Sequence, residues 1–369
     1  MASSPIHVTR PFLPPLEEVV EDLRTIWDSR ILTNNGPFHR RFEAALAEYL
    51  QVKHVVLFNN ATIALIVALK ALEIGGEVIT TPYSFVATAH SLSWNAISPV
   101  FCDIDARSLS LDPQAIRAAI TPKTQAILPV HCYGLPSAVA EIAQIASEHR
   151  LRVIYDAAHA FGIRNQQGSL LAHGDLSILS FHATKVFNSF EGGAIICHDD
   201  QLKHRIEQQR NFGFVDEVTV DEVGINGKMS EFNAALGLIQ LRHFPTAIAQ
   251  RQRIDRRYRE QLAQIRGIQL VELPQDYTSN HGYFPILVGP DYGLSRDQLY
   301  QRLKDNDIHP RRYFYPLISE FPAYRRLVSS RPINLPVATR VAQQVLCLPI
   351  YPGLSEPDQE RIIAIIKKA

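Results

Sequence analysis

The sequence lacks an excess of either charge, and it lacks any long apolar run. Lysine plus arginine number 37 and aspartate plus glutamate number 37 among 369 residues, so no net positive field attracts nucleic acid. No apolar run approaches the ~18 residues that span a membrane. The first residues, Met1–Pro5, do not resemble a signal peptide. We therefore expect a cytoplasmic protein that binds neither nucleic acid nor membrane.

Cysteine is scarce, and no spaced metal-ligand motif is present. The four cysteines lie singly, most of them in apolar runs, so we expect buried free thiols rather than disulfides. The 14 histidines form no His-x-x-x-His pair and have no Cys-x-x-Cys partner, so we expect no metal site.

The densest basic stretch, Arg251 to Arg259, also carries acidic residues at helical spacing. Asp255 lies four residues from both Arg251 and Arg259, and Arg256 lies four residues from Glu260. Side chains at this spacing share one face of a helix and attract one another. We expect a solvated, ion-paired helix face here rather than a nucleic-acid site.

The order of apolar segments predicts an α/β fold in two parts. Helical and strand-like segments alternate from about residue 14 to 240, which is typical of a mostly parallel sheet covered by helices on both faces. The expected strands lie near 55–58, 77–80, 98–102, 125–130, 152–155, 176–181 and 194–197. A long helix, roughly 230–265, would then lead into a smaller α+β domain.

That smaller domain would hold two strands and three helices. They are expected near 268–272, 283–288, 295–304, 336–346 and 355–368. The chain is long enough for two domains with a large core. We predict a large ligand-binding domain over residues 1–245 and a small C-terminal domain over residues 246–369.

The most informative stretch is residues 180–193, which reads SFHATKVFNSFEGG. Lys185 follows a predicted buried strand, and the pair Gly192-Gly193 opens another. Burial lowers the pKa of an amine and makes it nucleophilic, and glycine lets backbone approach a ligand closely. Such a lysine can form a Schiff base with pyridoxal phosphate (PLP). A surface lysine in a loop is the plain alternative.

Asp156 is expected at the carboxyl end of a parallel strand, where ligands collect in open α/β sheets. A buried carboxylate there needs a cation, and the protonated pyridine nitrogen of PLP would supply one. N-capping of the next helix is the alternative for Asp156. His159 would reach the cofactor's phenolic oxygen or stack beside its ring, with a structural histidine as the other interpretation.

Residues 58–62, which read FNNAT, lie between a β-rich run and an apolar helix. A strand, a polar turn and a helix N-terminus form a phosphate site in outline, because free amide groups and the helix dipole favour an anion. Thr62 adds a hydroxyl. The stretch is neither a P-loop nor a Gly-x-Gly-x-x-Gly turn, and ordinary capping by Asn60 or Thr62 is the alternative.

Two aromatic stretches add candidates for the same site. Tyr83 and Phe85 follow the expected strand at 77–80 and offer aromatic faces, with core packing as the alternative. Residues 311–315 read RRYFY; guanidinium groups suit phosphate or carboxylate, and rings suit sugar or base faces. We select Arg312 and Tyr315 as substrate-binding candidates, against a purely structural Arg–Tyr cluster.

Five motifs occur in one order along the chain. They read NAT at 60–62, SFVAT at 84–88, DAAH at 156–159, SFHATK at 180–185 and GINGKM at 224–229. They resemble the motifs of the DegT–StrS family of nucleotide-sugar aminotransferases, which are PLP enzymes of fold type I. The resemblance runs from about residue 32 to the C-terminus. Two positions differ from the residues most usual in the family. Ala61 stands where glycine is frequent, and Lys228 is a conservative choice at a basic position.

The resemblance implies a role for each candidate residue. Lys185 would carry PLP as a Schiff base, Asp156 would pair with the pyridine nitrogen, Phe85 would stack on the ring, and His159 would lie near the phenolic oxygen. The phosphate would be held by Ala61, Thr62 and Ser180. Asn226 would reach the phosphate of the neighbouring subunit's cofactor, which implies a homodimer with shared active sites.

The reaction implied is transfer of an amino group from L-glutamate to a keto sugar carried on a nucleoside diphosphate. Family members with His182, Ala183 and Glu191 at these positions look like those acting at C4 of the sugar. We therefore predict a dTDP-4-keto-6-deoxyhexose as substrate and a 4-amino-4,6-dideoxy sugar as product, destined for a surface polysaccharide such as a lipopolysaccharide O-antigen. His182 would line the sugar side of the site or be a packed histidine.

Two alternatives stay open. The first is a C3 aminotransferase acting on a 3-keto-6-deoxyhexose, and the second is a non-catalytic nucleotide-sugar binding protein. A binding protein without PLP would have no use for Lys185 together with Asp156.

Overall fold

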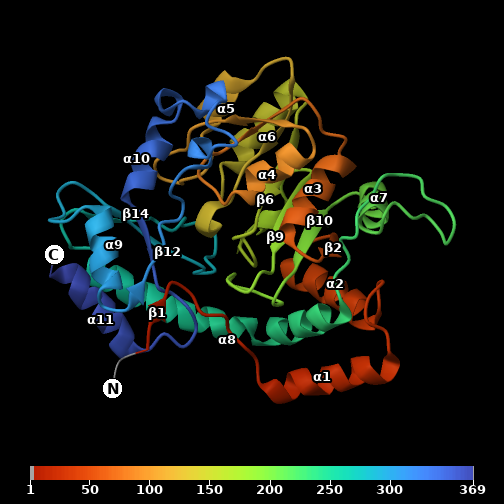
Figure 1. The fold of residues 1–369 in the computed structure, drawn as a ribbon, viewed down its shortest axis with the longest axis horizontal. Helices are drawn as coiled ribbons and strands as arrows, with labels where there is room; N and C mark the ends of the chain where they lie inside the picture. The colour runs from red at the N-terminus through yellow and green to blue at the C-terminus, as the bar shows by residue number, and fades with distance from the viewer. Residues whose placement is uncertain (1–3, 369) are drawn as a thin grey trace.

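The computed structural model describes residues 4–368, which form a seven-stranded sheet between helices and a smaller three-stranded sheet (Figure 1). The strands of the large sheet, in spatial order, are β2 (His54–Phe58), β10 (Gly193–Cys197), β9 (Leu176–Ser180), β6 (Arg152–Asp156), β5 (Thr124–Leu128), β3 (Glu77–Thr80) and β4 (Ser98–Phe101). β10 runs antiparallel to both of its neighbours, whereas the other adjacent pairs are parallel. The predicted α/β fold is confirmed.

Helices cover both faces of this sheet because successive strand side chains point to opposite faces. On one face Val56 and Ile195 pack against Leu65 of α3, and on the other Leu57 packs against Phe42 of α2. The helices of this part are α1 (Leu16–Ser29), α2 (Pro37–Leu50), α3 (Ala61–Ala71), α4 (Ala87–Trp94), α5 (Pro113–Ala119), α6 (Val139–His149) and α7 (Asp200–Arg210). A short hairpin, β7 (Arg164–Asn165) and β8 (Gly168–Ser169), lies after β6.

The C-terminal part holds the smaller antiparallel sheet, in the order β11-β12-β14. Its elements are β11 (Ile268–Leu270), β12 (Phe284–Val288), α9 (Arg296–Lys304), α10 (Pro336–Gln344), β14 (Val345–Leu348) and α11 (Glu356–Lys367). The helix expected near 336–346 is too long by two residues, because the chain turns into β14 directly after Gln344. β14 was not expected, since its four apolar residues continue the apolar pattern of the helix before it.

A single 32-residue helix, α8 (Glu231–Leu262), runs beneath both parts of the molecule (Figure 1). The proposed boundary between residues 245 and 246 falls inside this helix, which contains Pro245 and continues past it. The N-terminal strand β1 (Ile6–His7) pairs in parallel with β13 (Ile308–His309), so the chain's first described strand lies in the C-terminal part. The two-domain division stays a prediction.

The expectation of a solvated, ion-paired face on α8 is wrong for two of its residues. Arg251 is 2% exposed and Asp255 is 3% exposed. Asp255 does pair with Arg259, at 2.8 Å between Oδ1 and Nε, but Arg251 donates instead to the carbonyl of Ile350 at 2.9 Å. The reason is tertiary: this turn of α8 lies under the C-terminal strands, which helical spacing alone does not reveal.

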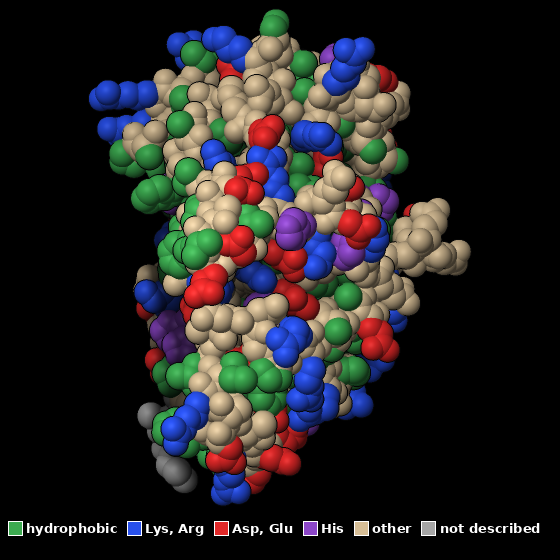
Figure 2. Space-filling view, turned by 90° about the vertical axis from the view of Figure 1, so that its right-hand side faces the viewer, with side chains coloured by type: hydrophobic (Ala, Val, Ile, Leu, Met, Phe, Trp, Pro, Cys, Tyr) green, Lys and Arg blue, Asp and Glu red, His purple; other side chains and the backbone are tan. Residues whose placement is uncertain are grey.

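The four cysteines are free and buried, as expected. Within residues 4–368, no helix combines the length and apolarity that crossing a bilayer requires. Acidic and basic side chains are interspersed over the face shown in Figure 2.

Candidate active site

A cavity of about 290 Å³ lies at the carboxyl ends of the parallel strands. Eight of the predicted site residues line it: Ala61, Thr62, Phe85, Asp156, His159, Ser180, His182 and Lys185. They come from strands and turns far apart in the sequence, and the parallel arrangement brings the ends of those strands to one edge. The remaining wall comes from the C-terminal part, through Tyr283, Arg311, Tyr313 and Phe314.

Lys185 stands in the turn that follows β9. Its backbone amide donates to the carbonyl of His182 at 2.9 Å, which fixes the turn. Burial lowers the pKa of the Lys185 amine to about 8, although the nearby Asp156 carboxylate and Cys132 thiol act in the opposite direction. Nζ donates to the hydroxyl of Tyr283 at 3.4 Å. An amine in this state is in part neutral near neutral pH, as a nucleophile or base requires.

Asp156 is the last residue of β6 and is 6% exposed. Its carboxylate accepts from the hydroxyl of Thr88 at 2.7 Å and from the amide of Ala158 at 3.2 Å. Burial nevertheless raises the pKa of the Asp156 carboxyl. No lysine, arginine or histidine of the described chain makes a salt bridge with it. A buried carboxylate that faces a cavity in this way is suited to a cationic ligand group.

His159 has one ring nitrogen committed and the other left as a donor. Nδ1 accepts from the backbone amide of Tyr133 at 3.0 Å, so the neutral ring carries its proton on Nε2. Burial holds the pKa of His159 well below its usual range. The ring packs 4.5 Å from that of Tyr283, between centroids.

The N-terminus of α3 forms another wall of the cavity. Asn60 caps the helix, its Oδ1 accepting from the amide of Ile63 at 2.9 Å. The amides of Ala61 and Thr62 precede the first intrahelical hydrogen bonds and are therefore available to an anion. Asn60 therefore caps α3, as the alternative interpretation expected, and the amides of Ala61 and Thr62 remain free beside it.

Gly192 lines the cavity, and both glycines also lie close to other parts of the protein. A Cβ on Gly193 would lie 2.6 Å from the backbone nitrogen of Ala61, and one on Gly192 would lie 2.5 Å from Oγ of Ser189. Glycine therefore lets β10 lie against the start of α3. At Gly193 the close approach is between two backbone segments, whereas Gly192 lies against side chains.

The match to known proteins covers almost the whole chain. Residues 16–367 match the DegT/DnrJ/EryC1/StrS aminotransferase family. The chain belongs to this family. Its members depend on PLP, and the chain is an aminotransferase by this relationship.

Individual relatives agree over their full lengths. The dTDP-4-amino-4,6-dideoxy-D-glucose transaminase of Shigella dysenteriae is 52% identical, with 99% of each chain covered. The protein of the same name from Escherichia coli is 51% identical, with 100% of this chain and 98% of the relative covered. The crystal structure of DesI with its TDP-sugar product has a TM-score of 0.94 at 36% identity, covering 99% of this chain and 93% of that one.

The site meets the requirements of the family's cofactor. PLP presents a phosphate, an aldehyde and a ring nitrogen that carries a proton. The cavity presents free helix amides, a partly neutral lysine and a carboxylate that makes no salt bridge within the described residues. Phe85 lies at the same cavity with its side chain 59% exposed, which leaves a ring face open. Tyr83, by contrast, is fully buried and bonds to the hydroxyl of Tyr133 at 2.6 Å, so it belongs to the core.

The substrate candidates of the aminotransferase lie in two places. His182 is exposed at the cavity, with Nδ1 2.8 Å from the Thr184 hydroxyl and Nε2 3.6 Å from Glu191. Arg312 and Tyr315 do not line this cavity; they line an adjoining hollow. Arg312 pairs there with Asp297 at 2.8 Å, and its guanidinium lies 5.2 Å from the Tyr315 ring.

The hollow and the cavity share a wall made of Ser84, Phe85, Arg311, Tyr313 and Phe314. The hollow and the cavity are therefore direct neighbours. The assignment of Arg312 and Tyr315 stays a prediction.

Asn226 is outside the wall of its own chain's cavity. It forms a bridge with Asn211, near the base of the segment that projects after α7 (Figure 1). This placement leaves the prediction that it serves a neighbouring subunit untested.

Three residues of the site are not among those predicted from the sequence. Thr88 lies inside the SFVAT motif, and its four-residue spacing from Ser84, to which it hydrogen-bonds at 2.8 Å, was a usable signal. Arg311 stands beside Arg312 in the same RRYFY stretch, and the sequence does not distinguish which of the two faces the cavity. Tyr283 carries no local signal, because its role depends on how the small sheet packs on the large one.

Proposed function

We propose that this aminotransferase moves an amino group from L-glutamate to C4 of a dTDP-linked 4-keto-6-deoxyhexose, giving a 4-amino-4,6-dideoxy sugar. The observation that carries the proposal is the convergence of Lys185, Asp156 and the α3 N-terminus on one cavity. The regiochemistry is supported by full-length similarity to two transaminases named for dTDP-4-amino-4,6-dideoxy-D-glucose. A C3 aminotransferase is the second candidate, since a relative 33% identical is named as a 3-aminotransferase.

PLP, when bound, supplies an electron-accepting ring and a carbonyl group to which an amine can be attached. Lys185 would hold it covalently, and Asp156 would keep a proton on the ring nitrogen. The amides of Ala61 and Thr62, with the hydroxyl of Ser180, would hold its phosphate. Phe85 would cover one ring face, and the Nε2 proton of His159 would be donated to the phenolic oxygen.

Lys185 has a second task once it is released. Its amine lies in the same cavity as the substrates and is in part neutral near neutral pH. In the first half-reaction Nζ would move the proton from Cα of the donor amino acid to the cofactor, and in the second it would move a proton from the cofactor to the sugar carbon that receives nitrogen.

The substrate would extend from the cavity into the adjoining hollow. His182 would face the sugar, and Arg312 with Tyr315 would contact the nucleotide part, where a guanidinium suits the diphosphate and a ring suits the base. Arg311, on the shared wall, would lie along the path between them.

We also propose a cytoplasmic homodimer with shared active sites, supplying an amino sugar for a surface polysaccharide such as an O-antigen. The segment that projects after α7 exposes apolar side chains that water does not favour. These are Phe212, Phe214, Val215, Val218, Val220, Val223 and Ile225. The buried free thiols suit a reducing compartment.

A substrate panel tests the reaction. The enzyme is incubated with L-glutamate and with 3-keto and 4-keto sugars on dTDP, UDP and GDP, and the product is examined by NMR. Nitrogen on C4 of the dTDP sugar is the expected result. Nitrogen on C3 would overturn the regiochemistry while leaving the transamination intact.

Mixed dimers test the shared site. An Asn226→Ala chain and a Lys185→Ala chain, each inactive alone, should recover part of the activity when heterodimers form, because one site then has both native residues. Verified heterodimers without activity would contradict the role of Asn226 in its neighbour.

A further inference from the structure

The hydroxyl of Tyr283 accepts a hydrogen bond from the amine of Lys185, although the two residues adjoin strands of different sheets. Lys185 follows β9 of the large sheet, and Tyr283 directly precedes β12 of the small one. Among residues 4–368, the Tyr283 hydroxyl is the hydrogen-bond partner of Nζ, at 3.4 Å. The contact therefore ties the position of the amine to the C-terminal part of the chain.

The segment that carries Tyr283 is anchored on both sides by buried polar groups. Asn280, 4% exposed, donates to the carbonyl of His159 at 2.8 Å and to that of Phe161 at 3.1 Å. Its Oδ1 accepts from the amide of Gly282 at 3.1 Å. Arg251 donates to the carbonyl of Gly282 at 3.4 Å from the other side. These bonds explain why an arginine of α8 is buried.

The ring of Tyr283 is held by other aromatic rings. Centroids lie 4.5 Å away for His159, 5.6 Å for Tyr133 and 6.1 Å for Tyr313. Rings at these distances and tilted angles attract one another and leave little freedom for rotation. The contacts with these rings thus restrict the position of the Tyr283 hydroxyl at the cavity.

We propose that Tyr283 is a positioning residue for Lys185, fixing Nζ where it meets the cofactor and the Cα proton of the donor. The inference rests on the proposed function, because it assigns the partner of the same lysine. A neutral phenol accepts a hydrogen bond from the ammonium form and donates one to the amine form. It can therefore hold Nζ through both stages of the reaction.

The charge state of Lys185 gives a test independent of turnover. Asp156, His159 and Cys132 are titratable groups near Nζ, and His182, Glu191 and Arg311 line the same cavity. Tyr283→Phe leaves all of them in place. The bond from an ammonium to a phenol is charge-assisted and stronger than the bond from an amine. Loss of the hydroxyl should therefore lower the pKa of Lys185.

The experiment uses full-length protein freed of PLP, labelled briefly with acetic anhydride between pH 6 and 11 and analysed by mass spectrometry. The labelling midpoint of Lys185 should fall by about half a pH unit in Tyr283→Phe. Tyr133→Phe is the matched control, because its hydroxyl bonds to Tyr83 in the same aromatic cluster and not to Nζ. Its midpoint should equal that of wild type.

Rates with the reloaded enzyme give the second measurement. Misplacing the amine should slow the half-reaction with L-glutamate about tenfold in Tyr283→Phe, with KM for glutamate changed less than about twofold. An unchanged labelling midpoint, or an equal shift in the Tyr133→Phe control, would overturn the inference. Attachment of PLP to another lysine would instead overturn the proposed function, so the two failures are distinguishable.

Discussion

Two carboxylates that are mostly shielded from solvent have opposite surroundings in this molecule. Glu43 on α2 lies 3.0 Å from Nε2 of His39 and 2.9 Å from the guanidinium of Arg210, and it accepts from the amide of Leu57 at 3.0 Å. Burial acts to raise its pKa, but these partners outweigh burial and lower the pKa of Glu43 to about 2. Asp156 accepts from two neutral donors and forms no salt bridge within residues 4–368. Burial raises its pKa, and the nearby Lys185 amine opposes this only in part.

The difference indicates that the Glu43 carboxylate stabilises the fold, whereas the Asp156 carboxylate is suited to binding a ligand. Glu43 joins α2, β2 and α7, and removing it would leave Arg210 unpaired in the interior. Asp156 faces a cavity and costs the cofactor-free protein stability that a bound cation can return. A buried carboxylate that forms no salt bridge and faces a cavity, at the end of a parallel strand, is thus the more informative feature for function.

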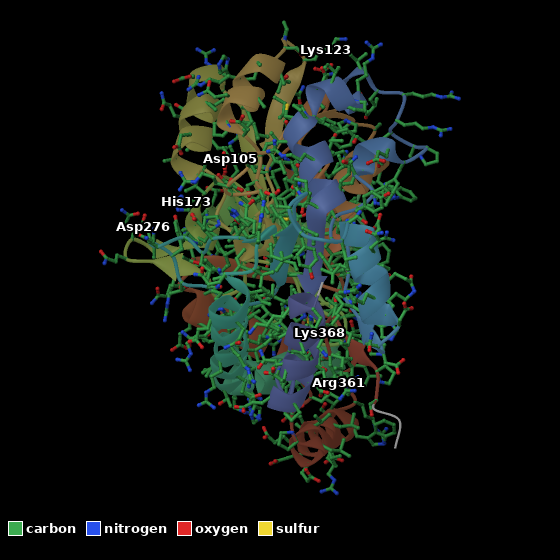
Figure 3. All side chains as sticks on the ribbon, turned by 90° about the vertical axis from the view of Figure 1, so that its left-hand side faces the viewer. Asp105, Lys123, His173, Asp276, Arg361 and Lys368 are labelled. Carbon is green, nitrogen blue, oxygen red and sulfur yellow. The ribbon has the colours of Figure 1, made fainter. Side chains whose placement is uncertain are left out.

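The largest expected effect is at the lysine that shares the cavity with Asp156. Lys185→Ala should reduce turnover by ~10⁴-fold or more, because it removes both the covalent attachment and the base. Stability of the cofactor-free protein should not fall, since burial already disfavours the charged amine. The measurements are the rate and the mass of borohydride-treated protein. Labelling of Lys228, or of Lys123 at one end of the molecule (Figure 3), would refute the assignment.

Asp156→Asn should slow the reaction about 10²-fold while PLP still binds, because an amide cannot hold a proton on the ring nitrogen. The pKa of Asp156 is higher in the folded state, so its ionised form costs stability above pH ~4, and the amide removes that cost. The thermal midpoint of the cofactor-free variant should equal or exceed that of wild type. A rate close to wild type would remove Asp156 from the mechanism.

Glu43→Gln should have the reverse profile: unfolding free energy lower by about 3 kcal/mol, and kcat unchanged for the folded enzyme. Because the folded pKa of Glu43 is about 2, its stabilisation is complete above the ordinary value of ~4.3 and is lost as the pH falls toward 2. Urea unfolding at several pH values measures this. Glu48→Gln, an exposed residue of the same helix, is the control. Equal stability of both variants would contradict the comparison.

The smallest expected effect is at the phosphate wall. Gly193→Ala places a Cβ 2.6 Å from the nitrogen of Ala61, which should displace the α3 N-terminus and weaken PLP binding about tenfold. Gly75→Ala, where the nearest atom is 3.8 Å away, should leave affinity unchanged. A spectrophotometric titration with PLP measures the affinity of each variant. Equal affinities of the two variants would show that the wall tolerates the change.

The sequence predicted the elements that depend on local pattern. All seven strands of the large sheet have distinct apolar runs bounded by turn residues, and the ends of these strands carry Asp156, Ser180 and Lys185. Parallel pairing then forces these ends to one edge, so eight of eleven candidates line one cavity. Their roles toward the cofactor stay predictions.

What the sequence could not predict depends on packing between distant segments. The burial of Arg251 follows from the strands that lie on α8, and the contact of Tyr283 with Lys185 follows from how the two sheets meet. β14 was hidden because its apolar residues continue those of α10 without a turn residue between them. Each is a tertiary effect without a local signature.

The place of β10 has a consequence for how the protein is made. This strand lies between β2, which leads into the phosphate wall, and β9, which leads into Lys185. Synthesis runs from the N-terminus, and pairings between segments distant in the chain form slowly. The pairing of β2 with β10 can therefore be completed only after residue 197 has emerged from the ribosome. A nascent chain shorter than this has no assembled cavity, and cofactor capture can only follow insertion of β10.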